Sequence, residues 1–158
     1  MRTAEIARDT NETRISLELE LDGEGQTQLN TGVGFFDHML DAMCRFGLID
    51  LELKCAGDLD VDAHHTKRCI MRVGSCYFPM YESLALFALV IRGLGVLAFA
   101  AEFPQPSCGL FDCQLAEEFF RAVAVNAGIT LHIRCDGRNS HHMLEAMFKA
   151  FGRALMQA

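Results

Sequence analysis

The sequence predicts an α+β sandwich, with sheets built from both halves of the chain and helices on one side. The first observation is an internal repeat, because residues 35–47 and 119–128 each begin with Phe-Phe and are apolar at helical spacing. Each stretch is followed by an alternating strand pattern, a glycine turn and two adjacent histidines. The second observation is that residues 13–23 alternate between apolar and polar side chains, as a half-buried strand does.

Residues 13–23 and 27–32 are expected to form two strands joined by a glycine-containing turn of the hairpin type. Residues 84–103 form an apolar tract in which only Arg92 and Glu102 are charged. Because Arg92 would lie near the middle of a membrane span, we expect a buried pair of strands or helices here. The helix predicted at the C-terminus has an apolar face formed by Met143, Met147, Phe148 and Phe151.

Composition restricts the class of protein. The 158 residues suit one domain, 1–158, made of two repeats at about 1–75 and 76–158. A formal charge of −7 without a basic block argues against a nucleic-acid partner.

The polar N-terminus lacks an apolar signal segment, which predicts a cytoplasmic protein with no membrane partner. The seven cysteines contain no C-x-x-C pair, so we expect most of them to be reduced core residues.

Four of the six histidines stand in two adjacent pairs, 64–65 and 141–142, at matching points of the two repeats. Neutral imidazole is the commonest transition-metal ligand, and Glu145 lies three residues beyond the second pair on the same helical face. The two pairs with Glu145 predict a divalent metal site, which manganese, iron, zinc, nickel or cobalt would suit. His38 and His132, each taken alone, are more typical of surface or satisfied core histidines.

Two basic residues lie near these histidines. Arg72 follows the first pair, and Lys149 stands one helical turn beyond Glu145. Each offers charged donors to an anion such as phosphate, but each fits a solvated face equally well.

Several segments carry a family pattern. They are Arg8-x-Thr10-x-Glu12-Thr13, residues 31–43, residues 57–66 with the first histidine pair, Pro79-Met80-x-Glu82, Leu131-His132 and residues 139–150. Together they resemble imidazoleglycerol-phosphate dehydratase of histidine biosynthesis, over nearly the full chain.

The resemblance implies a duplicated β-β-α-β fold of the ribosomal protein S5 domain 2-like kind, here with a truncated first-half helix. It also implies a large homo-oligomer built from trimers, of the 24-mer type, with active sites between subunits. The resemblance implies two Mn²⁺ ions in each site of the family, and two or fewer are expected in this chain. The metal ligands that the resemblance implies are His38, His64, His65, His132, His141, His142 and Glu145.

The implied reaction is the dehydration of imidazole-glycerol phosphate to imidazole-acetol phosphate. Metal ions would hold the substrate imidazole while the ring pushes electrons towards the departing hydroxyl. The resemblance assigns catalytic roles to Glu12 and Glu145, and Glu12 also contacts the polar chain of this small-molecule phosphate substrate. Arg72 and Lys149 would hold the phosphate.

The chain departs from the family pattern at three places. After Thr66 the family continues into Glu, Asp and a helix of several turns, whereas this chain has an internal deletion and places Arg68 at the spacing of the lost Glu. Leu94 replaces an Arg that contacts phosphate in the family, and Phe46 replaces a His. These departures favour an alternative function, a catalytically impaired metal-binding homologue.

Overall fold

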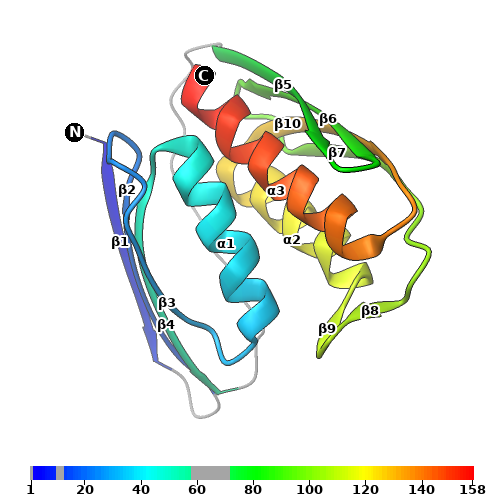
Figure 1. Ribbon diagram of the computed structural model, residues 1–158. Coiled ribbons are helices and arrows are strands. Elements are labelled where there is room, and N and C mark those ends of the chain that lie inside the picture. The colour runs from blue at the N-terminus through cyan, green and yellow to red at the C-terminus, as the bar shows by residue number, and fades with distance from the viewer. Residues whose placement is uncertain (1, 10–12, 58–71) are drawn as a thin grey trace.

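The computed structural model describes residues 2–9, 13–57 and 72–158 (Figure 1). The first half contains β1 (Thr3–Asp9), β2 (Thr13–Glu20), β3 (Thr27–Asn30), α1 (Gly34–Gly47) and β4 (Asp50–Gly57). The second half contains β5 (Arg72–Met80), β6 (Ser83–Ile91), β7 (Val96–Ala101), β8 (Ser107–Cys108), β9 (Phe111–Asp112), α2 (Gln114–Ala127), β10 (Ile129–Asp136) and α3 (Ser140–Gln157).

The two halves have the same topology. Each half forms one four-stranded sheet, with strand orders β1-β2-β4-β3 and β5-β6-β10-β7. In each sheet the first two strands pair antiparallel, and the last strand lies between the second, which is antiparallel to it, and the third, which is parallel. A helix connects the two parallel strands, α1 in the first half and α2 in the second. The predicted α+β fold with duplicated halves is therefore confirmed.

The helices fill the space between the two sheets (Figure 1). The C-terminal helix α3 packs against α1 on one side and against β5 and β6 on the other. Aromatic rings pack on α3 from two elements: the Phe87 ring centroid of β6 is 5.0 Å from that of Phe151, and the Phe120 centroid of α2 is 5.1 Å from that of Phe148. Burial of such rings contributes roughly 1.5–3 kcal/mol each. The predicted C-terminal helix is confirmed, and it joins the two sheets through one core.

The predicted hairpin between residues 13–23 and 27–32 is wrong. Both segments contain strands, but β4 lies between β2 and β3, so these two strands do not pair. The turn between them is instead held by Asp50, whose Oδ1 accepts the backbone N–H groups of Glu24 at 2.9 Å and Gln26 at 2.7 Å. A turn pattern shows where the chain reverses, but it does not show that the two strands on either side of the turn pair with each other. Here β4, a strand later in the sequence, lies between them.

The edge strand β1 has no counterpart among the sequence predictions. Its side chains are mostly polar, and even Ile6 is exposed, so the strand lacks the alternation that marks a buried face. Backbone pairing with β2 from Thr3↔Glu20 to Asp9↔Arg14 forms it instead. The side-chain pattern along the sequence does not reveal backbone pairing of this kind, so it did not predict the strand.

The apolar tract at residues 84–103 forms most of β6 and all of β7, which flank β10 on its two sides. The prediction of a strand pair is confirmed, but only β6 buries one of its faces, because β7 is the edge strand and its residues alternate between exposed and half-buried. None of the described helices combines the length and the apolar character that a membrane crossing requires.

The cysteines among the described residues belong to the core. Cys44, Cys113 and Cys135 are buried, and the other three are half-buried and pack against them or their neighbours. Burial raises the pKa of the Cys44 and Cys135 thiols to about 12, so these two groups stay protonated and unreactive. The predicted core role is confirmed for the six described cysteines.

Helices α1 and α3 cross with their backbones nearly in contact. A Cβ added at Gly152 would lie 2.0 Å from the carbonyl oxygen of Met43, and one added at Gly47 would lie 2.9 Å from the carbonyl oxygen of Gly152. Only residues without a side chain permit this approach. The crossing brings the outer residues of α1 close to the first turns of α3.

We expect Gly152→Ala to lower the free energy of unfolding by about 2–3 kcal/mol, because the added methyl group must displace backbone. Gly34→Ala is the matched control, since a Cβ there meets nothing within 4 Å and alanine favours a helix by up to about 1 kcal/mol. Urea unfolding followed by circular dichroism measures both variants. Equal stabilities of the two would contradict the close crossing.

Candidate functional site

The second histidine pair lies in the first turn of α3, which begins at a well-defined cap. The side-chain oxygen of Asn139 accepts the backbone N–H groups of His141 at 2.9 Å and His142 at 3.3 Å. Ser140 is fully buried, and its hydroxyl donates to the backbone oxygen of Gln105 and accepts the Gln105 N–H, both at 2.9 Å. The Gln105 side chain in turn accepts the Ser140 N–H at 2.8 Å. Three hydrogen bonds thus attach this turn to the 104–106 segment.

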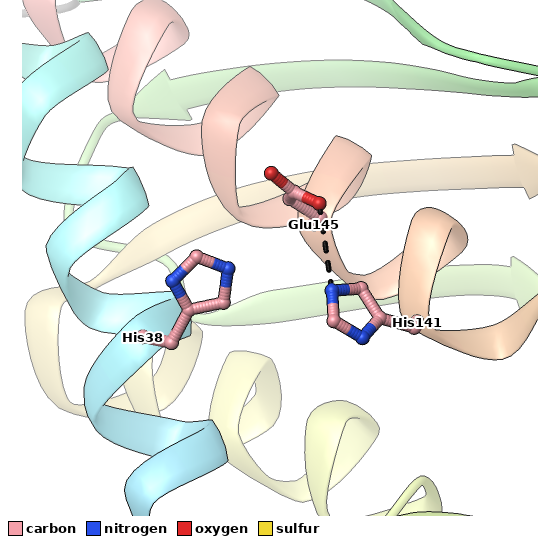
Figure 2. Close-up of side chains that lie close together, drawn as sticks. All are labelled: His38, His141 and Glu145. Carbon is pink, nitrogen blue, oxygen red and sulfur yellow. Dashed lines mark ion pairs between the residues drawn. The ribbon is translucent and has the colours of Figure 1, made fainter.

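His38, His141 and Glu145 form a three-residue cluster across the helix crossing (Figure 2). Each residue offers one ligand atom, and these atoms lie within 4.8 Å of one another. His38 comes from α1, whereas His141 and Glu145 are one turn apart on α3 with 3.6 Å between Nε2 and Oε2. Two imidazole nitrogens and one carboxylate oxygen suit a divalent transition metal. The donor set of this cluster therefore fits the metal that the sequence predicts.

An aromatic wall borders the cluster. The Phe35 ring lies 5.2 Å from that of His141 and 5.3 Å from that of Phe111 in β9. The Phe36 ring also stacks on Phe111, with 5.9 Å between the ring centroids. These apolar contacts limit rotation of the His141 ring and restrict water on one side of the cluster.

Lys149 contacts Glu145 on the far side of the cluster. Its Nζ is 2.7 Å from Glu145 Oε1, and the two side chains are only 14% and 11% exposed. The ammonium also lies over the Phe46 ring at 5.1 Å and near the Phe78 ring at 5.8 Å. One Glu145 oxygen is thus held by Lys149, while the other faces His141. Phe46, for which the sequence indicates no role, forms part of the apolar surroundings of this ion pair.

His142 points to a different neighbour from His141, as adjacent positions on a helix do. Its Nδ1 lies 2.9 Å from Oε2 of Glu82, in the turn between β5 and β6. The Tyr81 ring of the same turn lies 4.7 Å from the His142 ring. Two hydrogen bonds keep the pKa of Glu82 below its usual range. The larger effect comes from its own backbone N–H, and the next from the His142 side chain. Sequence reasoning gave Glu82 no role, although its position in the Pro79-Met80-x-Glu82 segment marked it.

His132 lies apart from the cluster. Along β10 the residues Leu131 and Ile133 are buried towards the helices, so His132 is exposed on the outer face of the second sheet. Its register neighbours there are Ala88 of β6 and Ala98 of β7. One chain alone therefore brings together His38, His141 and Glu145, but not His132.

The remaining predicted site residues fall outside the described part of the chain or at its border. Four of them lie outside the described residues, namely Glu12, His64, His65 and Arg68. Arg72 is the first residue of β5, and its side chain lies outside the described part as well.

Comparison with known proteins identifies close relatives. A family model described as imidazoleglycerol-phosphate dehydratase matches residues 31–69 and 66–155. Imidazoleglycerol-phosphate dehydratases from Clostridium acetobutylicum and Desulfitobacterium hafniense are 48% and 50% identical to the chain. The alignments cover 99% and 98% of this chain and 89% of each relative.

Solved structures are similar as well. The imidazoleglycerol-phosphate dehydratase of Staphylococcus aureus matches with a TM-score of 0.84 and 32% identity, over 99% of this chain and 98% of its own. The structure of IGPD from Pyrococcus furiosus in complex with (S)-C348 has a TM-score of 0.79 over 97% of this chain and 92% of its own. Its identity is 24%, so this second likeness supports the fold alone.

The family match is interrupted where the sequence predicts a deletion. Its two segments overlap at residues 66–69. The alignment with the Clostridium relative extends over 176 residues, more than the 158 residues of this chain. That relative therefore contains residues that have no counterpart here.

We expect Lys149→Met to lower the free energy of unfolding of the metal-free protein by about 2–3 kcal/mol, because it leaves the Glu145 carboxylate buried without its cation. The matched control is the double variant Lys149→Met/Glu145→Gln, which removes both charges and should regain most of the loss. Urea unfolding measures the three proteins. A single variant within about 0.5 kcal/mol of the parent would mean that the ion pair is unimportant for folding.

Proposed function

The chain belongs to the imidazoleglycerol-phosphate dehydratase family, and we propose that it removes water from imidazole-glycerol phosphate to give imidazole-acetol phosphate in histidine biosynthesis. The family membership supports the reaction, and the cluster of His38, His141 and Glu145 is the observation that carries the proposed metal dependence. The proposed location is the cytoplasm.

We propose Mn²⁺ as the metal. The described residues that would hold it are His38, His141 and Glu145. By family resemblance His64, His65, His132 and His142 would complete the ligand set. A bound divalent cation would supply electrophilic stabilisation by gripping the nitrogens of the substrate imidazole.

The chain's own residues would orient the substrate and the proton-accepting groups. Glu12 is proposed to contact the hydroxyls of the glycerol chain. Glu145 is held by Lys149 at Oε1, so that its Oε2 faces His141 and the space beside it. An ammonium has three N–H donors, and those on Lys149 contact Glu145 Oε1 at 2.7 Å and Met80 Sδ at 3.7 Å. The third donor would serve a substrate phosphate, which Arg72 would also contact.

We propose a large homo-oligomer built from trimers, and the position of His132 supports contact between copies of the chain. This proposed ligand is exposed on the outer face of the second sheet, whereas the cluster lies on α1 and α3 between the sheets. A second copy that places its His132 beside this cluster would complete the ligand set. The outer face around His132 includes exposed apolar side chains at Val73, Tyr77, Leu84 and Val96, which an interface would cover.

An alternative function is that of a catalytically impaired metal-binding homologue. Two sequence features favour it: Leu94 stands where the family has a phosphate-contacting Arg, and Arg68 stands at the spacing of a ligand Glu. The interrupted family match adds a third. The alternative keeps metal binding but predicts little turnover.

Turnover of imidazole-glycerol phosphate in the presence of Mn²⁺ distinguishes the two functions. We expect product formation by the parent and a loss of at least about 100-fold in His141→Ala, because a direct ligand is removed. Arg121→Ala, on the exposed face of α2, is the control and should match the parent. Metal binding by a folded parent without turnover would favour the impaired homologue.

We expect Leu94→Arg to tighten a phosphate-bearing imidazole ligand about tenfold, since one charge-assisted contact contributes roughly 1.5–3 kcal/mol. Leu94 is 52% exposed, and its backbone oxygen accepts the Thr130 hydroxyl at 3.1 Å, a bond that the substitution leaves intact. Calorimetry with a phosphate-bearing and a phosphate-free ligand measures the difference. Leu94→Met controls for side-chain size, and equal affinities in both variants would disprove the role of position 94.

A further inference from the structure

The turn between β5 and β6 contacts the second histidine pair across sixty residues of sequence. Met80 pairs with Ser83 at the end of the two strands, so that Tyr81 and Glu82 form the turn itself. Glu82 Oε2 lies 2.9 Å from His142 Nδ1. The contact is therefore made by a short, strand-anchored turn, which offers little freedom of position.

The other carboxylate oxygen of Glu82 also has a partner. The Ser83 hydroxyl donates to Glu82 Oε1 at 3.3 Å, and Ser83 is only 1% exposed. A buried hydroxyl has few alternative partners, so it keeps the carboxylate in one orientation. The Glu82 oxygen that faces His142 is thus fixed before any ligand arrives.

The imidazole of His142 has two distinct ring nitrogens. A carboxylate only accepts hydrogen bonds, so the Nδ1 that faces Glu82 must carry the proton. In a neutral ring the proton on Nδ1 leaves a lone pair on Nε2. The Tyr81 ring, 4.7 Å from the His142 ring, restricts rotation that would exchange the two nitrogens.

We propose that Glu82 is a positioning residue that holds His142 in the Nδ1–H tautomer and so presents the Nε2 lone pair to a divalent cation. The proposal rests on the proposed metal dependence, in which His142 is a ligand. In other metal sites the removal of such an outer partner of a ligand histidine weakens metal binding about 10–100-fold. Glu82 acts through His142 and is not expected to touch the substrate.

The first test is the tautomer of His142 in metal-free protein, because it depends on neither metal nor turnover. Protonated and unprotonated imidazole nitrogens have widely separated ¹⁵N shifts, which selective histidine labelling resolves, and His142→Ala assigns the signal. We expect the Nδ1–H form in the parent and in Glu82→Gln, whose amide oxygen still accepts, and a mixture of tautomers in Glu82→Leu. Glu118→Leu, an exposed change on α2, is the matched control.

The second test is calorimetric titration with Mn²⁺ alone. Glu82→Leu should weaken binding about tenfold and Glu82→Gln much less. The double variant Glu82→Leu/His142→Ala should bind Mn²⁺ no more weakly than His142→Ala, since Glu82 acts only through that ring. Circular dichroism confirms that each variant is folded.

Three results would overturn the proposal: an Nε2–H tautomer in the parent, an unchanged tautomer in Glu82→Leu, or a changed tautomer with unchanged Mn²⁺ affinity. The parent spectrum decides the question by itself if Glu82→Leu does not fold. A parent that binds Mn²⁺ through His142 but has no turnover would contradict the proposed dehydratase function and leave the role of Glu82 intact.

Discussion

The close approach of α1 and α3 determines the geometry of the candidate site. Gly47 and Gly152 allow the two backbones to meet, and the cluster lies further along the same crossing, where His38 faces His141 and Glu145. Any increase in the distance between the helices would separate the three donors that the proposed cation would need together. The core phenylalanines of α2, α3 and β6 support this crossing from behind, so core packing and site geometry depend on the same helix.

Duplication supplied two sheets of identical topology, but their outer faces differ in chemistry. On the first sheet Glu5, Glu18 and Glu52 are register neighbours across three strands. Like charges in directly opposed positions repel, and solvent must screen them, so this face suits contact with water. On the second sheet the corresponding rows are rich in alanine, valine and leucine around His132. The same backbone pattern thus carries one wetted face and one face suited to a neighbouring subunit.

Periodicity identified the elements that bury a continuous face, namely α1, α2, α3, β4 and β10, because burial imposes a residue pattern. It failed for β1, which is exposed, and for the pairing of β2 with β3, which depends on where β4 enters the sheet. In the site, the histidine pair and Glu145 could be predicted because their spacing lies within one helix. The contacts of Lys149 with Phe46 and of His142 with Glu82 could not, since each joins segments far apart in the sequence.

The attachment of α3 to the 104–106 segment has a consequence for the energetics of metal binding. Gln105 stands between Pro104 and Pro106, whose rings fix their own backbone angles and restrict the residue before each of them. This stiff segment makes three hydrogen bonds to Ser140, the residue next to His141. A flexible loop would lose conformational entropy on coordinating an ion. Here much of that entropy has already been lost during folding. A cation at the proposed site would meet a preorganised ligand, so that more of its interaction energy would be expressed as affinity.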